Sequence, residues 1–211
     1  DGLILNTKAQ GGAMDDKLYQ VLKELTRSVA KDNDVPPFVV FQEPSLMDMA
    51  NQYPITLEEL ANIQGVGQGK ANKYGAAFVE TIAEYVEEND IERAQDIVVK
   101  SVVNKSGTKV YIIQNIDRKR PLEDIAKARD MSMEEILTEI ENIVDSGTKV
   151  NLDYYINDAI DEDKQDEIYD YFMEDAETGT IEEAIKEMED EDYSEEEIRL
   201  MRIKFMSEVA N

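Results

Sequence analysis

A glycine-rich segment, residues 65–70, is the part of this chain whose residue spacing most clearly suggests chemistry. Glycines let the backbone turn tightly, so the free N–H groups that begin the following helix can point at a phosphate. The segment is not a nucleotide-binding P-loop, because that pattern requires Gly at Gln64 and Ser or Thr at Ala71. The sequence therefore predicts a hairpin between two helices that binds phosphate, or a tight connection without a ligand. The residues assigned to this site are Gly65, Gly67, Gly69, Lys70 and Lys73.

A second candidate site is a group of basic residues in the middle of the chain. Residues 97–129 hold eight Lys or Arg against three acidic residues, although the whole chain has 48 acidic and 22 basic residues and a formal net charge of −26. Such side chains bind DNA by neutralising backbone phosphates, without reading the base sequence. We predict this weak contact with DNA; the alternative is a solvated helix face that offsets the acidic tail. The eight residues are Lys100, Lys105, Lys109, Arg118, Lys119, Arg120, Lys127 and Arg129.

Phe38 is a third candidate, because an exposed aromatic ring can stack on a base. It begins the apolar run of residues 38–41, so the alternative is that its ring packs in the core. The same alternative applies to Phe41, Tyr74 and Phe78.

The composition excludes several kinds of catalytic and metal site. The chain has no His and no Cys, which rules out a Cys/His zinc site, a thiolate nucleophile and a His-based triad. Residues 151–211 hold 22 acidic residues against five basic ones, but none of them forms the spaced Asp loop with a terminal Glu that binds calcium. We therefore predict no catalytic residue and no metal ligand, and we assign the acidic residues to solvated helix faces and caps.

The pattern of the first half predicts helices and turns. After a flexible lead-in at residues 1–13, apolar residues recur every three or four positions up to Asp32. Residues 38–41 are expected to form a short buried helix or turn, and residues 44–52 a further helix. A capping box at residues 56–59 begins a short helix, and a longer one follows the glycine segment. The result is an all-α domain over residues 14–90.

A polar stretch at residues 87–90 predicts a linker to a second domain, residues 97–211. Helices are expected at 108–117, 121–129 and 132–144, a helix-turn-helix pattern, followed by acidic helices at 163–175, 181–189 and 195–209. The segments 97–103 and 148–156 are open to either strand or helix. The third helix carries Glu134, Glu135, Glu139 and Glu141, which we expect to face outward and to be repelled from a DNA groove.

Several short segments, in this order, resemble the HRDC domain, a module of helicases and RNase D. They are residues 18–25, 35–41, 44–50, 53–60 and 63–75, and the resemblance covers about residues 14–90. The segment Pro121–Ala126 resembles the helix-turn-helix appendage at the C-terminal end of some bacterial RecQ helicases. The resemblance implies a mainly α fold: a five-helix HRDC-like bundle, then a helix-turn-helix domain with an acidic helical tail.

The resemblance to RecQ helicases implies a non-catalytic accessory region that helps its parent engage DNA in replication, recombination or repair. ATP and Mg would be needed only by a motor domain outside this sequence, and this fragment would need no cofactor. Its expected partners are DNA, the helicase core of its own protein and other repair proteins. Two alternatives stay open: a protein-docking module that recruits partners, and the HRDC tail of an RNase D-like exoribonuclease.

The sequence also suggests where the protein acts. No run approaches the roughly 18 apolar residues of a membrane span, and residues 1–13 lack the basic start and apolar stretch of a signal peptide. We therefore expect a soluble, cytoplasmic protein with no membrane partner. The chain does not begin with Met, which suggests a fragment of a longer protein.

Overall fold

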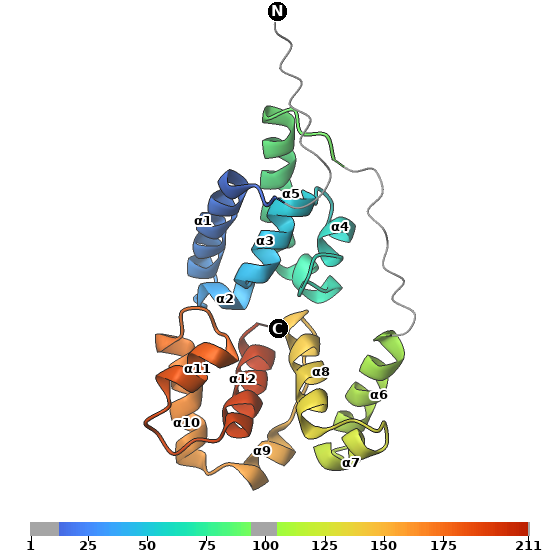
Figure 1. The fold of residues 1–211 in the computed structure, drawn as a ribbon, viewed down its shortest axis with the longest axis vertical. Coiled ribbons are helices and arrows are strands. Elements are labelled where there is room, and N and C mark those ends of the chain that lie inside the picture. The colour runs from blue at the N-terminus through green and yellow to red at the C-terminus, as the bar shows by residue number, and fades with distance from the viewer. Residues whose placement is uncertain (1–12, 94–104, 211) are drawn as a thin grey trace, which may run out of the picture.

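The computed structural model describes residues 13–93 and 105–210 of the chain. Within these ranges all regular elements are helices and there is no strand, so the prediction of a mainly α fold is confirmed. The helices form two groups that follow one another along the long axis of the molecule (Figure 1). None of the described helices is long and apolar enough to span a membrane.

The first group of helices is held by local capping. The Asp15 carboxylate accepts a hydrogen bond from the Leu18 N–H at 3.0 Å, and the Thr56 hydroxyl accepts one from the Glu59 N–H. Each satisfies an N–H group that the first turn of a helix leaves free. The helices are α1 (Asp16–Asp32), α2 (Pro37–Val40), α3 (Glu43–Gln52), α4 (Leu57–Ala61) and α5 (Gln68–Glu88).

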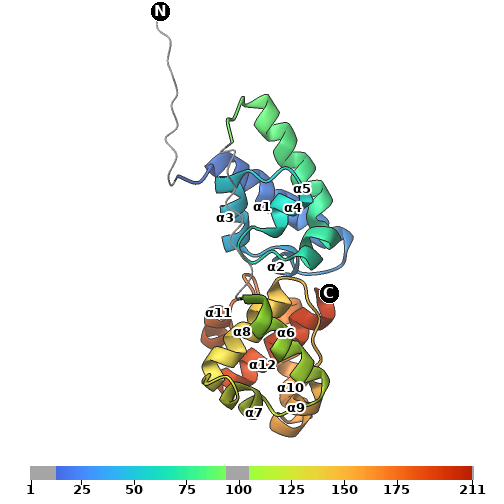
Figure 2. The same ribbon diagram turned by 90° about the vertical axis from the view of Figure 1, so that its right-hand side faces the viewer.

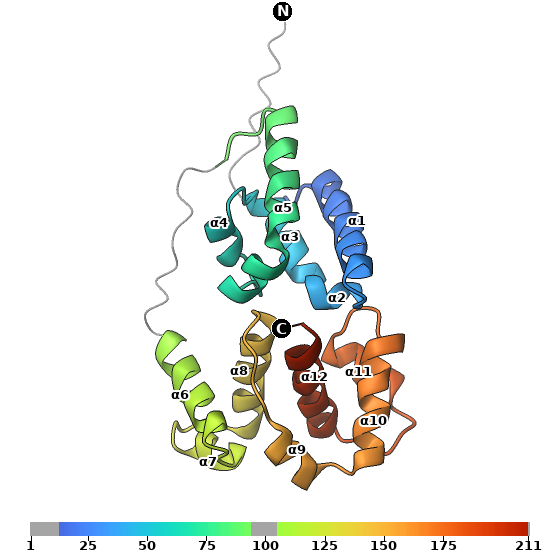
Figure 3. The same cartoon turned by 180° about the vertical axis from the view of Figure 1, so that it is seen from behind.

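The second group is arranged around its last helix. That helix has nine buried residues in 15 and packs against four other helices of the group, so it occupies the centre (Figure 3). It is α12 (Glu195–Val209), and its neighbours are α8 (Met133–Asp145), α9 (Asp153–Ala159), α10 (Glu162–Asp170) and α11 (Ile181–Glu187). The group also includes α6 (Lys105–Asp117), α7 (Leu122–Lys127) and a π-helical turn, η2 (Tyr171–Asp175), that extends α10.

The buried apolar residues form two clusters, one in each group of helices. Phe38 and Val39 are the exceptions, because they belong to α2 but pack into the cluster of the second group. Phe41, Tyr74 and Phe78 are buried in the first cluster, as expected for core residues. The two groups therefore share an apolar contact through α2, and the C-terminal end of α12 lies at the same junction (Figure 2).

The alternation at residues 148–156 does not produce a strand. Val150, Leu152 and Ile156 are buried, but a loop leads to Leu152 and α9 begins at the next residue. Val150 instead bonds a side chain of α12: its N–H donates to the Ser207 hydroxyl at 2.8 Å, and its carbonyl accepts from that hydroxyl at 2.6 Å. The other ambiguous segment, 97–103, lies outside the described residues.

Candidate nucleic-acid interface

Three consecutive basic side chains project from the turn between α6 and α7. Arg118, Lys119 and Arg120 are all exposed, and none of them has an ion-pair partner among the described residues. The backbone beneath them is fixed, because the Lys119 N–H donates to the Ile116 carbonyl at 2.8 Å and the Arg120 N–H to that of Asn115 at 3.1 Å. The turn thus presents three free cations on an ordered backbone.

The ordered turn depends on a left-handed residue and on a contact with α9. Lys119 has φ +57°, a conformation that closes the end of a helix but is uncommon for residues other than Gly. The Arg120 carbonyl accepts a hydrogen bond from the Tyr154 hydroxyl at 2.6 Å. All these bonds to the turn are made by its backbone atoms, not by its three basic side chains.

The remaining basic residues of the predicted group are less uniform. Lys127 and Arg129 are exposed, and the Arg129 guanidinium lies 4.2 Å from the centre of the Tyr111 ring. Lys109 is half-buried on α6. Lys105 begins α6, and Lys100 lies outside the described residues. We call Arg118, Lys119, Arg120, Lys127 and Arg129 the basic surface.

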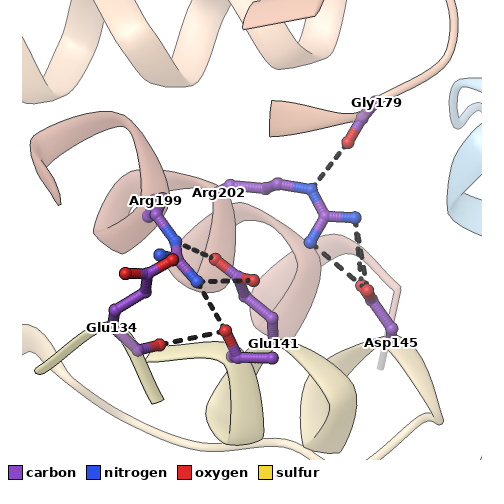
Figure 4. A network of polar contacts seen from close by, with 7 residues as sticks. Glu134, Glu141, Asp145, Gly179, Arg199 and Arg202 are labelled. Atoms are coloured by element: carbon purple, nitrogen blue, oxygen red, sulfur yellow. Dashed lines mark hydrogen bonds and ion pairs between the residues drawn. The ribbon is translucent and has the colours of Figure 1, made fainter. Parts of the chain in front are cut away.

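The helix that would read DNA bases in a helix-turn-helix domain, α8, is covered by α12. The Arg199 guanidinium donates to both carboxylate oxygens of Glu141, at 2.8 and 3.2 Å, and to the Thr138 hydroxyl at 2.9 Å (Figure 4). The expectation that Glu141 faces outward is therefore wrong: its side chain is 14% exposed and ion-paired. Glu134 and Glu135 are exposed, and Glu139 is half-buried.

A second ion pair joins the C-terminal end of α8 to α12. The Arg202 guanidinium lies 3.2 Å from an Asp145 carboxylate oxygen and also donates to the Gly179 carbonyl at 2.6 Å (Figure 4). Sequence reasoning missed both arginines. Their signal was two arginines, three positions apart, in residues 198–203, whose other members are all apolar.

The predicted phosphate hairpin exists, and the second group of helices engages two of its N–H groups, whereas Gly65, Gly69 and Lys73 stay exposed. Gly67 caps α5, and Gly65 has φ +73°, the turn geometry that favours glycine. The Gly67 N–H donates to the Ser146 carbonyl at 3.0 Å, and the Lys70 N–H donates to the same oxygen at 3.4 Å. The α5 N-terminus thus already has an oxygen partner, supplied by the loop after α8.

The charged residues of the hairpin also contact the second group. Lys70 is 2% exposed, and burial lowers the pKa of its ammonium to about 8, although the nearby Asp145 carboxylate opposes this shift. The Lys73 ammonium donates to the Ala210 carbonyl, beyond the end of α12, at 3.2 Å. Lys70 is therefore not presented to a ligand in this arrangement, whereas Lys73 is exposed.

Phe38 is 3% exposed, so its ring is not available to stack on a base in this arrangement. It packs 6.0 Å from the Phe205 ring of α12, measured between ring centres. Among the predicted site residues that the structure describes, the basic surface is exposed, whereas Lys70 of the hairpin and Phe38 are buried. Whether either set binds DNA stays a prediction.

Comparison with known families assigns the first group of helices and the first part of the second group. Residues 15–82 match the HRDC domain family, and residues 106–156 match the RecQ-1-like, helix-turn-helix domain family. The chain carries an HRDC domain followed by a RecQ-like helix-turn-helix domain. This pair matches the C-terminal region of RecQ helicases. The hairpin lies in the HRDC domain and the basic surface lies in the helix-turn-helix domain. Residues 157–210 lie outside both matched ranges.

Relatives of the chain carry helicase names. It is 36% identical over 83 residues to the ATP-dependent DNA helicase RecQ of Bacillus subtilis, covering 39% of this chain and 14% of that protein. It is 35% identical over 81 residues to the RecQ of Haemophilus influenzae, covering 38% and 13%. It is also 28% identical over 126 residues to the bifunctional 3′-5′ exonuclease/ATP-dependent helicase WRN of Mus musculus, covering 53% and 9%. The chain thus matches a small part of the length of each relative, and the HRDC and helix-turn-helix matches include no helicase motor domain.

Proposed function

We propose that this chain is a non-catalytic, DNA-engaging region of a RecQ-type helicase, and that it contacts the phosphate backbone through the basic surface. The observation that carries the proposal is the exposed run Arg118, Lys119 and Arg120, which has no acidic partner among the described residues. Backbone contacts of this kind hold a protein on DNA without selecting a sequence.

The charge of the chain sets the strength of this contact. A net charge of −26 repels DNA at long range, whereas the basic surface attracts it within about 8 to 10 Å, the Debye length at physiological salt. Binding is therefore weak and steeply salt-dependent. Reading of bases by α8 is not part of the proposal, because α12 covers that helix and pairs its Glu141 and Asp145.

Fluorescence anisotropy with a labelled duplex tests the contact at several salt concentrations. If five phosphates are neutralised, the slope of log affinity against log salt is about −4.5, and replacing Arg118, Lys119 and Arg120 by Ala lowers its magnitude by up to about 2.7. The matched control replaces Lys17, Arg27 and Lys31, three exposed bases of α1, which changes the net charge equally. Equal losses of affinity in both triple variants would count against the basic surface.

The role within the parent protein is also a proposal. An ATP- and Mg-dependent motor domain would supply the unwinding, and this region would assist it on DNA in replication, recombination or repair. We expect the purified fragment to turn over no ATP. The match to a RecQ-like helix-turn-helix domain favours this parent over an RNase D-like exoribonuclease.

A protein-docking function is the second candidate. The helix-turn-helix domain already uses α8 for protein packing, through two ion pairs with α12. The acidic residues of the last helices would then recruit basic partners or the helicase core. Absence of any duplex binding at low salt would favour this function over DNA engagement.

A further inference from the structure

The side chain of Arg129, in the basic surface, lies on an aromatic ring. Its guanidinium is 4.2 Å from the centre of the Tyr111 ring, a distance at which a cation and a ring attract one another. Tyr111 is half-buried and packs against the apolar core of the helix-turn-helix domain, whereas Arg129 is exposed and has no ion-pair partner among the described residues. One face of the planar guanidinium is therefore covered by the ring, and the other is left to the solvent.

The backbone fixes both members of this pair. Tyr111 belongs to α6, and its carbonyl accepts a hydrogen bond from the side-chain amide of the buried Asn115 at 2.7 Å. Arg129 follows α7, which packs against α6 (Figure 1). The Arg129 N–H donates to the Ala126 carbonyl at 3.0 Å, and the Met131 N–H donates to the same oxygen at 2.9 Å. A planar ligand thus meets a pair whose position is already set, which lowers the entropy cost of binding.

Charge alone attracts DNA only weakly to this surface. Residues 117–130 hold five basic and four acidic residues, a net charge of +1. The acidic residues are exposed as well, so they repel phosphates beside the cations that attract them. A ligand that offers flat rings in addition to phosphates gains a stacking contribution that the acidic residues do not oppose. The four acidic residues are Asp117, Glu123, Asp124 and Asp130.

We propose that Arg129 and Tyr111 form a stacking platform, on which the helix-turn-helix domain binds an unpaired base of single-stranded DNA. The inference rests on the proposed function, because Arg118, Lys119 and Arg120 hold the phosphates of the same strand in it. A guanidinium stacks on a base through its planar face, whereas the bases of a duplex already stack on one another. The domain therefore prefers single-stranded to double-stranded DNA.

Two single strands of equal charge test whether bases contribute to binding. One is a fluorescein-labelled thymidine strand of about 12 nucleotides, and the other has the same length and phosphates but abasic sugars throughout. Fluorescence anisotropy at low salt measures both affinities. We expect the chain to bind the thymidine strand about fivefold or more tightly than the abasic strand, because stacking adds to the phosphate contacts. Equal affinities would overturn the platform, since phosphates alone would then explain binding.

Arg129→Lys is the main test variant, because it keeps the positive charge but removes the planar group. It should lose the preference for the thymidine strand, while the slope of log affinity against log salt stays unchanged. Arg118→Lys is the matched control: it makes the same exchange at an exposed arginine with no ring contact among the described residues. This control should retain the preference. Retention of the preference in Arg129→Lys, or its equal loss in both variants, would overturn the platform.

Tyr111→Leu tests the ring beneath the guanidinium. Leucine keeps apolar packing against the core but cannot hold the guanidinium flat, so the preference for the thymidine strand should fall. Circular dichroism checks that this variant is folded; if it is not, Arg129→Lys alone decides, because the Arg129 side chain is exposed. Failure of the proposed function is seen separately: no binding of either strand or of a duplex would overturn the basic surface and the platform together, whereas equal binding of both strands would overturn the platform alone.

Discussion

Lys70 belongs to the predicted phosphate site, but in the structure it contacts the other domain instead. Its backbone N–H and its side chain both lie against the helix-turn-helix domain, and the ammonium is buried near Asp145, Arg202 and Lys73. Burial disfavours the charged form, and two of the three neighbours are themselves cations. The pKa of Lys70 therefore falls from its ordinary 10.5 to about 8.

This lowered pKa predicts that the contact between the two domains becomes more stable at alkaline pH. Below pH 8 Lys70 is protonated whether the two domains are in contact or apart. Between pH 8 and 10.5 it keeps its proton only in the released form, in which the domains are apart. Stability rises with pH wherever the released form binds more protons, by roughly 3 kcal/mol over this window. The chain has no Cys, so dyes attached at Asn51→Cys on α3 and Asp158→Cys on α9, two exposed positions, report on the contact between the domains. Energy transfer between these dyes, followed during titration with urea at each pH, measures the effect. Lys70→Met keeps the length of the side chain and should remove this pH dependence; an identical rise in that variant would contradict the assignment.

Among the elements, α12 covers α8 and so limits the contacts that α8 can make with other molecules. Arg199 pairs with Glu141 and Arg202 with Asp145, so two acidic residues of α8 are held by α12, while Glu134 and Glu135 stay exposed. Breaking a largely buried ion pair by removing one side leaves a charge without compensation. Arg202 is the more buried arginine and also holds the Gly179 carbonyl.

Arg202→Ala is accordingly expected to lower the free energy of unfolding of the helix-turn-helix domain by about 3 kcal/mol, and Arg199→Ala by about 2 kcal/mol. Urea denaturation followed by circular dichroism measures both. The double variant Arg199→Ala with Glu141→Ala should be less destabilised than the sum of its single variants, because no charge is left unpaired. Strict additivity would show that the pair contributes nothing.

The helix caps and one loop also show which structural features can be predicted from local sequence patterns and which cannot. The caps at Asp15, Thr56 and Ser132 were predictable because each bonds an N–H only three residues away. The loop before α9 was not predictable as a loop, because Val150 is buried by bonds to Ser207, 57 positions later. Alternation of buried residues arises there from long-range packing, not from a pleated strand.

The same division applies to the candidate site. The exposed turn at Arg118–Arg120 follows from local polarity and from the helix end at residue 117, so its presentation could be predicted. The contact of the hairpin with the loop after α8 could not, because Ser146 lies far from Gly67 in sequence and no local pattern links them.

For the whole molecule, Phe38 is the residue that most directly couples the two domains. Phe38→Ala removes a buried ring from the junction, and a truncation of this kind costs about 3 to 5 kcal/mol. We expect lower energy transfer between the two dyes and a lower unfolding midpoint of the helix-turn-helix domain. Phe41→Ala is the matched control, because the Phe41 ring lies within the HRDC domain, 4.7 Å from the Phe78 ring between ring centres. This variant should destabilise the HRDC domain but retain energy transfer between the dyes in the folded chain. Equal loss of transfer in both variants would show that Phe38 has no special part in coupling.

The central position of α12 has a consequence for how the protein is made. The HRDC domain encodes its core within the first 90 residues, so it can fold while the ribosome is still extending the chain. The helices α6 to α8 leave the ribosome much earlier than α12, which begins about 50 residues after α8 ends. At about 5 to 20 residues per second, translation of that interval takes roughly 3 to 10 seconds. During this time Ile136, Ile140 and Ile143 have no α12 to cover them, so the nascent helix-turn-helix domain is expected to be a chaperone client until synthesis reaches Val209.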